Sequence, residues 1–392
     1  MRATPAPRPT AIVSGRFAGT PGQGGATWAI LQYALGLRVL GWDVFLVEPL
    51  DQPFVEPHPG VGTGFEPPPE VAAYFQDVCR RFDLVESAAL LDASGRRAWG
   101  VPYQRLVEVA RGADLLLNLS GVLRDDELTG PVRNRVYVDL DPGFTQLWSE
   151  VEGLDMGFDG HTHFATVGQG LGEPDCTVPT GDRRWIPTLP PVVMGHWPAI
   201  EPRAGAFTTV GNWRAYGSIR HAGVHYGQKA HALRPLMDLP RAAAERVQLA
   251  LTIHPDERPD LDALSAGGWD LVDPAHAAGT PDRYRRFIGD SFAELGIAKS
   301  GYVESDCGWF SDRSACYLAS GRPVLAQDTG FSRYLPTGAG LSAFRTLEEA
   351  AEGLRAIRAD YAVHSRAARI LAQDRFDSDR VLTSLLGQVG LT

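Results

Sequence analysis

GWFSDRSACYLASGRPVLAQDTG, residues 308–330, is the stretch that decides how this chain folds. Its pattern predicts a loop, a helix, a tight turn, a buried strand and a second loop. Hydroxyl and carboxylate side chains at 311–314 are typical of a helix start, because they accept hydrogen bonds from first-turn amides. Gly321 suits the position just after a helix end, and the apolar run 323–326 predicts a strand.

The start of this helix is also a candidate anion site. First-turn amides lack partners within a helix, and the helix dipole places positive charge at the same end. The turn reads Ser311, Asp312, Arg313 and Ser314, so a guanidinium is available as a counter-charge. We therefore expect a phosphate-bearing ligand here, while an ordinary βαβ crossover with a polar cap would give the same local pattern.

The N-terminal half opens with a βαβ unit. A short apolar strand is followed by a glycine-rich loop, a predicted helix over 26–40 and a second strand at 44–47 that closes with Glu48. The loop includes Gly24 and Gly25 and offers bare backbone to a ligand. A dinucleotide site with Glu48 on the ribose is the alternative, but this long loop does not fit the GxGxxG fingerprint.

Strands continue to alternate with helices along this half. Two predicted strands run into Ser120 and Asp141, and the carboxyl ends of parallel strands form the ligand-binding edge of such a sheet. His161 and His163 lie at a further strand, where a histidine is more often a hydrogen-bonded structural residue, although imidazole also transfers protons near neutral pH. No ligand cluster accompanies this HxH spacing, so a metal site is not expected.

A proline-rich segment divides the chain. Residues 185–202 carry five prolines and predict an extended linker, after which the βα rhythm restarts. This second series places Asn212 at a strand tip, Lys229 near a helix start and Lys299 shortly before the 308–330 stretch.

The predicted fold is therefore α/β, with two Rossmann-like domains facing a central cleft and helices at the C-terminus. We predict an N-terminal domain over 1–190, a hinge over 191–204 and a C-terminal domain over 205–392. Clefts between domains are common small-molecule sites and permit closure that expels water.

Composition limits the function classes. The 392 residues are 44% hydrophobic and 21% charged, as in globular proteins, and carry a formal net charge of −10. This charge argues against a surface for nucleic acid or anionic membranes. No run is apolar enough to span a bilayer, and the first ten residues lack the apolar core of a signal peptide. The four cysteines are widely spread, which is typical of reduced thiols in the cytoplasm.

The order of elements resembles that of the GT-B glycosyltransferases, which pair an N-terminal acceptor domain with a C-terminal nucleotide-sugar domain. The segment 316–324, CYLASGRPV, is similar to the E-A-x-A-x-G-x-P-V segment of their donor site. Gly24 and Gly25 resemble the glycine loop of family-4-like members. Asn212 and Lys229 lie where those members carry an arginine and a lysine for the diphosphate.

The chain departs from the family at its acidic positions. The family-4 pattern E-x7-E would place acids at Gly308 and Cys316. The family-1 pattern His-Gly-Gly-x-Gly-Thr is echoed only by small and polar residues before the helix. The ribose-binding acid is therefore expected elsewhere, with Asp312 or Asp328 as substitutes.

The resemblance implies a metal-independent glycosyltransferase without a cofactor, acting as a monomer or homodimer. The co-substrate would be a UDP-, dTDP- or GDP-sugar, and the acceptor a soluble small molecule such as an antibiotic intermediate. Candidates for orienting or deprotonating the acceptor are Glu48, Asp141, His161 and His163. Candidates for the donor site are Gly24, Gly25, Asn212, Lys229, Lys299, Ser311, Asp312, Arg313, Ser314 and Asp328.

Three other functions fit the same architecture. They are a nucleotide-sugar epimerase or hydrolase, an NAD- or flavin-dependent oxidoreductase, and a non-catalytic ligand-binding subunit. Formation of an epimer or free sugar without an acceptor, binding of a nicotinamide or flavin, and nucleotide binding without turnover would identify them in turn.

Overall fold

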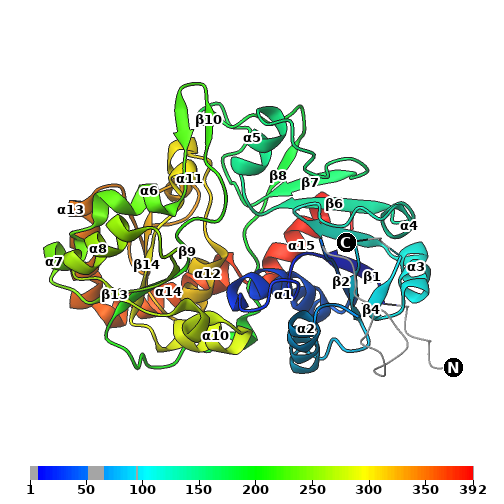
Figure 1. The fold of residues 1–392 in the computed structure, drawn as a ribbon, viewed down its shortest axis with the longest axis horizontal. Coiled ribbons are helices and arrows are strands. Elements are labelled where there is room, and N and C mark those ends of the chain that lie inside the picture. Colours follow the sequence, from blue (N-terminus) through cyan, green and yellow to red (C-terminus); the bar gives the residue numbers. More distant parts are fainter. Residues whose placement is uncertain (1–7, 52–65, 94–95, 392) are drawn as a thin grey trace.

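Two α/β domains lie side by side in the structure, a computed structural model that describes residues 8–51, 66–93 and 96–391 (Figure 1). Each domain is built on a mainly parallel sheet that is packed against helices. This arrangement confirms the predicted α/β class with two Rossmann-like domains. The first ten residues were predicted to lack the apolar core of a signal peptide, and residues 1–7 of them lie outside the described residues.

The first sheet has its opening strand near the centre. The strand order is β4-β3-β2-β1-β5-β6-β7-β8 within the described residues, and β3 and β4 form its antiparallel pair. Apolar strands such as β5 are buried throughout, as expected in a parallel sheet covered on both faces. The strands are β1 (Thr10–Ser14), β2 (Asp43–Pro49), β3 (Ala88–Leu91), β4 (Ala98–Gly100), β5 (Leu115–Leu119), β6 (Asn134–Asp139), β7 (His163–Thr166) and β8 (Trp185–Pro187).

The second sheet repeats this arrangement with the order β13-β12-β9-β14-β15-β16. In the first sheet β1 lies between β2 and β5, and in the second β9 lies between β12 and β14, so each sheet has a switch point beside its first strand. The strands are β9 (Phe207–Asn212), β12 (Val247–Thr252), β13 (Asp270–Leu271), β14 (Ala293–Gly296), β15 (Val324–Gln327) and β16 (Leu341–Phe344), with a separate hairpin of β10 (Ile219–His221) and β11 (Val224–Tyr226).

The helices follow the strands in the predicted alternation. The glycine-rich loop leads into a helix that begins two residues before the predicted start, and Gly321, at φ +68°, follows the helix of the 308–330 stretch as expected. Within the described ranges, no helix combines the length and the apolarity needed to cross a membrane. The first-domain helices are α1 (Gly24–Val39), α2 (Pro69–Arg81), α3 (Tyr103–Gly112), α4 (Asp126–Thr129) and α5 (Phe144–Glu150). The later helices are α6 (Lys229–Leu233), α7 (Leu239–Ala243), α8 (Arg258–Gly267), α9 (Pro274–Ala278), α10 (Pro281–Asp290), α11 (Ser300–Ser305), α12 (Asp312–Ala319), α13 (Leu347–Ala359), α14 (Tyr361–Arg375) and α15 (Ser378–Gln388).

The proline-rich segment is partly a strand, which corrects the prediction of a linker throughout. Residues 185–187 form β8 and pair in parallel with β7. Pro187 is the last residue of this edge strand, a position where the missing amide is tolerated.

The C-terminal helix α15 returns to the first domain and packs on α1 (Figure 1). Gly36 of α1 permits this approach, because an added Cβ would lie 2.6 Å from Leu382 Cδ1. The Val192 amide donates to the Phe376 carbonyl, and the Ser378 amide donates to the Val192 carbonyl. The domain limits at 190 and 205 remain a prediction. Helix α15 belongs to the C-terminal part of the sequence, but it contacts the N-terminal domain.

Candidate functional site

The first turn of α12 forms the predicted cap. Ser311 Oγ accepts a hydrogen bond from the Arg313 amide at 3.2 Å. The Ala315 amide bonds to the Ser311 carbonyl at 3.0 Å, and amides before it in a helix have no helical partner. Gly296–Ala298 and Gln327, at the ends of β14 and β15, line a small cavity together with this turn. We call this group, with residues 311–314, the α12 seat.

Two basic side chains flank the α12 seat. Arg313 Nε bonds to Glu294 Oε1 of β14 at 2.5 Å, and Lys229 Nζ bonds to the Ile297 carbonyl. An added Cβ at Gly211, near the end of β9, would lie 3.8 Å from Arg313 Nη1 and 3.9 Å from Lys229 Cε. The structure therefore brings Arg313 and Lys229 together at the tip of the central strand.

Burial shifts the pKa values of the two basic side chains at the α12 seat. The Glu294 side chain is fully buried, and Arg313 exposes 11% of its side chain. Burial alone would lower the pKa of Arg313, but the Glu294 carboxylate outweighs that effect and raises it. Burial, with the nearby Arg313 charge, lowers the pKa of Lys229 well below its ordinary value. An anion at the α12 seat would favour the charged form of Lys229.

The remaining donor-site candidates of this domain differ in availability. Asn212 is exposed at the tip of β9. The Asp328 carboxylate accepts hydrogen bonds from the Ser332 hydroxyl and the Arg345 guanidinium, both at 2.9 Å. These contacts account for Asp328 without a ribose. Asp312 forms no salt bridge among the described residues; burial raises its pKa, and the Arg313 charge and the amides of Arg313 and Asp312 oppose the rise.

The structure explains why the two family acids are absent. Gly308 adopts φ +73°, and an added Cβ would lie 2.9 Å from the Gly170 amide nitrogen. A glutamate there would be strained and would collide with the first domain. Cys316 is buried in α12, and its Sγ accepts a weak hydrogen bond from Gln32 Nε2 of α1 at 3.7 Å. Both positions therefore serve to join the domains.

An ion pair bridges the carboxyl ends of the two sheets. Asp141 follows β6 and Lys299 follows β14, and Lys299 Nζ lies 2.9 Å from Asp141 Oδ2. The Tyr216 and Tyr302 hydroxyls both donate to the same carboxylate. The Lys299 ammonium also lies 4.1–5.1 Å from the ring centroids of these tyrosines and Phe144. We call these five residues the bridging cluster; they are Phe144, Asp141, Tyr216, Lys299 and Tyr302. Two of them, Asp141 and Lys299, are predicted site residues, and they pair with each other.

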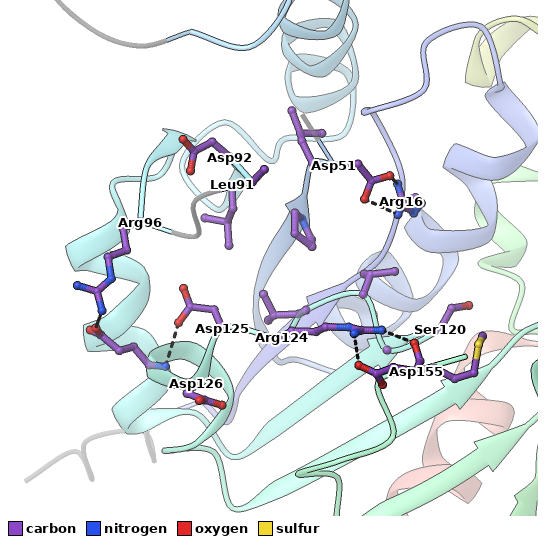
Figure 2. A pocket seen from close by; sticks show the side chains of 18 of the residues that line it. Arg16, Asp51, Leu91, Asp92, Arg96, Ser120, Arg124, Asp125, Asp126 and Asp155 are labelled. Carbon is purple, nitrogen blue, oxygen red and sulfur yellow. Dashed lines mark hydrogen bonds and ion pairs between the residues drawn. The ribbon is translucent and has the colours of Figure 1, made fainter. Parts of the chain in front are cut away.

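A cavity of about 940 Å³ opens at the carboxyl edge of the first sheet (Figure 2). Its walls come from the segments that follow β1, β2, β3 and β5, so it lies at the switch point where such folds bind ligands. Two ion pairs, Arg16–Asp51 and Arg124–Asp155, lie on these walls, and Ser120 lies beside them (Figure 2). We call it the first-domain cavity.

Aromatic contacts connect this cavity to the α12 seat. Trp148 lines the cavity and packs edge-on against Tyr216 of the bridging cluster, with ring centroids 4.5 Å apart. Tyr302 of the same cluster stacks on Trp309, which precedes α12, with centroids 4.1 Å apart. Side-chain contacts therefore link the cavity, the bridging cluster and the α12 seat in one continuous chain across the two domains.

Glu48 has a structural role, contrary to the prediction that it handles the acceptor. Its carboxylate accepts hydrogen bonds from the amides of Phe17, Ala18 and Gly19 at 2.7–3.0 Å. Burial raises the pKa of Glu48, and these three amides oppose the rise. Glu48 thus fixes the glycine-rich loop and does not face an open site.

Gly24 is buried against the second domain and Gly25 is half-buried beside it, whereas the sequence predicted both in an open donor loop. An added Cβ at Gly24 would lie 2.2 Å from the Thr280 carbonyl oxygen, and one at Gly25 would lie 2.8 Å from the Tyr284 ring. Gly24 permits the close approach of α1 to the α9–α10 turn, and Gly25 permits the approach of the Tyr284 ring of α10.

The two histidines bond to residues outside the bridging cluster and the α12 seat. Asn118 Nδ2 donates to His161 Nε2 at 3.1 Å, His161 Nδ1 contacts the Phe158 carbonyl at the same distance, and burial lowers the pKa of His161. His163 begins β7 and contacts Thr162 Oγ1, so it lies at the amino end of its strand. These contacts favour the structural interpretation of His161, and a role of either histidine in acceptor activation stays a prediction.

Sequence reasoning missed two buried acids that organise the site. Asp139 accepts hydrogen bonds from the Asp141 amide and from the side chains of Thr145, Gln146 and Thr166 at 2.7–3.0 Å. It thereby fixes the loop that carries Asp141. Glu294 pairs with Arg313, and a charged residue inside an apolar strand was the available signal for such a pair. Among the described residues, no group of three or more His, Cys, Asp or Glu could hold a metal ion.

No family model matches this chain, and no curated protein matches it in sequence. Solved structures match it over nearly its whole length. An α-glucosyltransferase in complex with UDP and DNA has a TM-score of 0.62 at 11% identity, covering 98% of this chain and 99% of that one. HepE of Anabaena, in complex with UDP-glucose, has a TM-score of 0.58 at 12% identity, covering 97% and 99%. AviGT4, a glycosyltransferase involved in avilamycin A biosynthesis, has a TM-score of 0.50 at 12% identity, covering 98% and 97%. The chain therefore has the GT-B fold of these glycosyltransferases.

Proposed function

We propose that this protein transfers a sugar from a nucleoside diphosphate sugar to a small-molecule acceptor. The observation that carries the proposal is the chain of side-chain contacts that links the α12 seat, through the bridging cluster, to the first-domain cavity. The donor diphosphate binds at the α12 seat, where amides, Arg313 and Lys229 stabilise the charge that develops on the leaving group. UDP-, dTDP- and GDP-sugars are the candidate donors, and the complex of HepE with UDP-glucose favours the UDP class among them.

The first-domain cavity is the proposed acceptor site. Its volume of about 940 Å³ lies within the range typical of small-molecule sites, roughly 300–1,000 Å³. The acceptor hydroxyl approaches the donor beside the bridging cluster, where Asp141 orients it or receives its proton. For this, Lys299 must release Asp141 and contact the donor or the acceptor instead. This change of partner couples the binding of the two substrates.

The acceptor is proposed to be a small molecule and not a nucleic acid. One structural neighbour was solved with DNA, but the net charge of −10 of this chain opposes binding to phosphate backbones. An antibiotic intermediate is one possible acceptor, because AviGT4 is involved in avilamycin A biosynthesis.

A labelled-sugar assay tests the proposal. The protein is incubated with UDP-, dTDP- and GDP-sugars, with and without a pool of hydroxylated acceptors, and nucleoside diphosphate release and labelled products are measured. We expect one nucleotide class to give acceptor-dependent label transfer. Release to water alone would identify a hydrolase, an altered sugar still attached to its nucleotide would identify an epimerase, and binding without turnover would identify a non-catalytic subunit.

A further inference from the structure

The walls of the first-domain cavity carry an excess of negative charge. Among the described residues that line it, six are acidic and three are arginines. The walls therefore have a formal net charge of −3, against −10 for the whole chain of 392 residues. The six acids are Asp51, Asp92, Asp125, Asp126, Glu127 and Asp155. Because a cleft focuses the field of the charges on its walls, this excess acts on any charged ligand that enters.

Each arginine on these walls already has an acid beside it (Figure 2). The pairs are Arg16–Asp51, Arg124–Asp155 and Arg96–Glu127, with nitrogen–oxygen distances of 2.7, 2.5 and 3.6 Å. In the first two pairs the carboxylate is the more exposed partner, with 73–74% of its side chain exposed against 49–52% for the arginine. Asp92 is fully buried and lies 3.7 Å from Arg97, which compensates its charge. The three wall arginines therefore offer no uncompensated positive charge to a ligand.

Asp125 and Asp126, at the start of α4, supply the uncompensated negative charge. Asp125 Oδ1 accepts a hydrogen bond from the Glu127 amide at 2.9 Å, and Oδ2 accepts one from the Tyr103 hydroxyl at 2.8 Å. Both donors are neutral, and neither aspartate forms a salt bridge within the described ranges. The start of this short helix offsets at most about half a charge. Asp125 is half-buried and Asp126 is exposed, so neither is closed off from a ligand.

We propose that the acceptor carries a protonated amine, held at the Asp125 and Asp126 wall of the first-domain cavity; this inference rests on the proposed glycosyltransferase function. An ammonium group donates hydrogen bonds and accepts none, which matches ionised carboxylates, since these only accept. An acceptor with a carboxylate or phosphate group would instead meet like charges that oppose its entry. Trp148 and Met156 line the same cavity, so apolar surface of the acceptor can be buried there. The amine is the group that is recognised, and the sugar is transferred to a hydroxyl beside Asp141.

Calorimetric titration of three small probes tests this charge preference. Tyramine, N-acetyltyramine and 4-hydroxyphenylacetate share a hydroxylated ring and are cationic, neutral and anionic at neutral pH. We expect tyramine to bind about 2–5-fold more tightly than the neutral probe, the worth of one exposed ion pair, and the anion to bind most weakly. The advantage of tyramine should shrink at high salt, because exposed charges are screened.

The outcomes separate the charge assignment from the proposed function. Tyramine that binds no better than N-acetyltyramine, or an anion that binds most tightly, would overturn the assignment of an amine. Because the probes need no sugar donor, either result leaves the proposed sugar transfer standing. Absence of acceptor-dependent transfer in the labelled-sugar assay would instead overturn the proposed function and the acceptor assignment with it.

Two matched variants locate the amine. Asp125→Asn removes the charge but keeps the helix cap, because asparagine caps helices as well as aspartate does. Asp273→Asn is the control, since Asp273 caps α9 through the Ala275 amide at 2.9 Å and does not line the cavity. We expect Asp125→Asn to weaken tyramine binding about 2–5-fold and to leave N-acetyltyramine unaffected, whereas Asp273→Asn should change neither. Unchanged tyramine binding in Asp125→Asn, or an equal loss in both variants, would contradict the assignment.

Discussion

The charge of single buried residues decides what the α12 seat binds. Lys229 lies beside Arg313 at the tip of β9, and burial lowers its pKa well below the ordinary value of 10.5. Glu294 compensates Arg313 through a buried ion pair, so Lys229 is the cation whose charge remains adjustable. A diphosphate at the seat would supply the missing counter-charge.

Nucleotide affinity should therefore depend on pH through Lys229. The ammonium binds an anion only when protonated, so affinity is highest below the lowered pKa and falls as pH rises through it. Calorimetry of the wild type should show this fall at pH values below 10.5. Lys229→Arg should flatten the profile, because a guanidinium stays protonated throughout. The nucleotide itself titrates equally in both proteins, and identical profiles would exclude Lys229 from the site.

At the scale of elements, the loop before α12 joins the two domains through close backbone contacts. The Gly170 amide donates to the Cys307 carbonyl at 2.8 Å, and Gly308 lies against Gly170 with φ +73°. The positive φ and the missing side chain at Gly308 both serve this junction, which places Trp309 between the bridging cluster and the α12 seat.

Gly308→Ala should therefore destabilise the protein. A non-glycine residue in this conformation costs about 1–3 kcal/mol in the free energy of unfolding, before the steric contact with Gly170 is counted. Gly112→Ala is the matched control, because nothing lies within 4 Å of an added Cβ at the end of α3. It should leave stability unchanged or raise it by up to about 1 kcal/mol. Chemical denaturation of both variants checks this, and equal stability would contradict the role of Gly308.

The elements that the sequence predicted best are those with local signals. The α12 start has a polar cap, and its end has a left-handed glycine, so both limits were predictable. β8 escaped prediction because three residues with a terminal proline give no alternation, and its order comes from pairing with β7. The hairpin of β10 and β11 gives equally little local signal, because its strands have three residues each.

At the scale of the whole molecule, the site depends on contacts that no local pattern encodes. Asp141 and Lys299 were both predicted as site residues, but their pairing requires two sheets to face each other at a fixed distance. Gly24 and Gly25 were predicted to face a ligand, and they instead admit the α9–α10 turn of the other domain. The ligand-binding edge of each sheet was predictable from strand alternation, whereas the partners across the cleft follow from domain packing, including the return of α15 to α1.

The central claim is that a donor diphosphate binds at the α12 seat, opposite the first-domain cavity. The most direct measurement is a crystal structure of the protein with whichever of UDP, dTDP or GDP binds it. We predict phosphate oxygens within hydrogen-bond distance of the amides of 311–314, with Arg313 and Lys229 beside them. A nucleotide bound to the glycine-rich loop of the first domain, with the α12 seat left to solvent, would contradict the account.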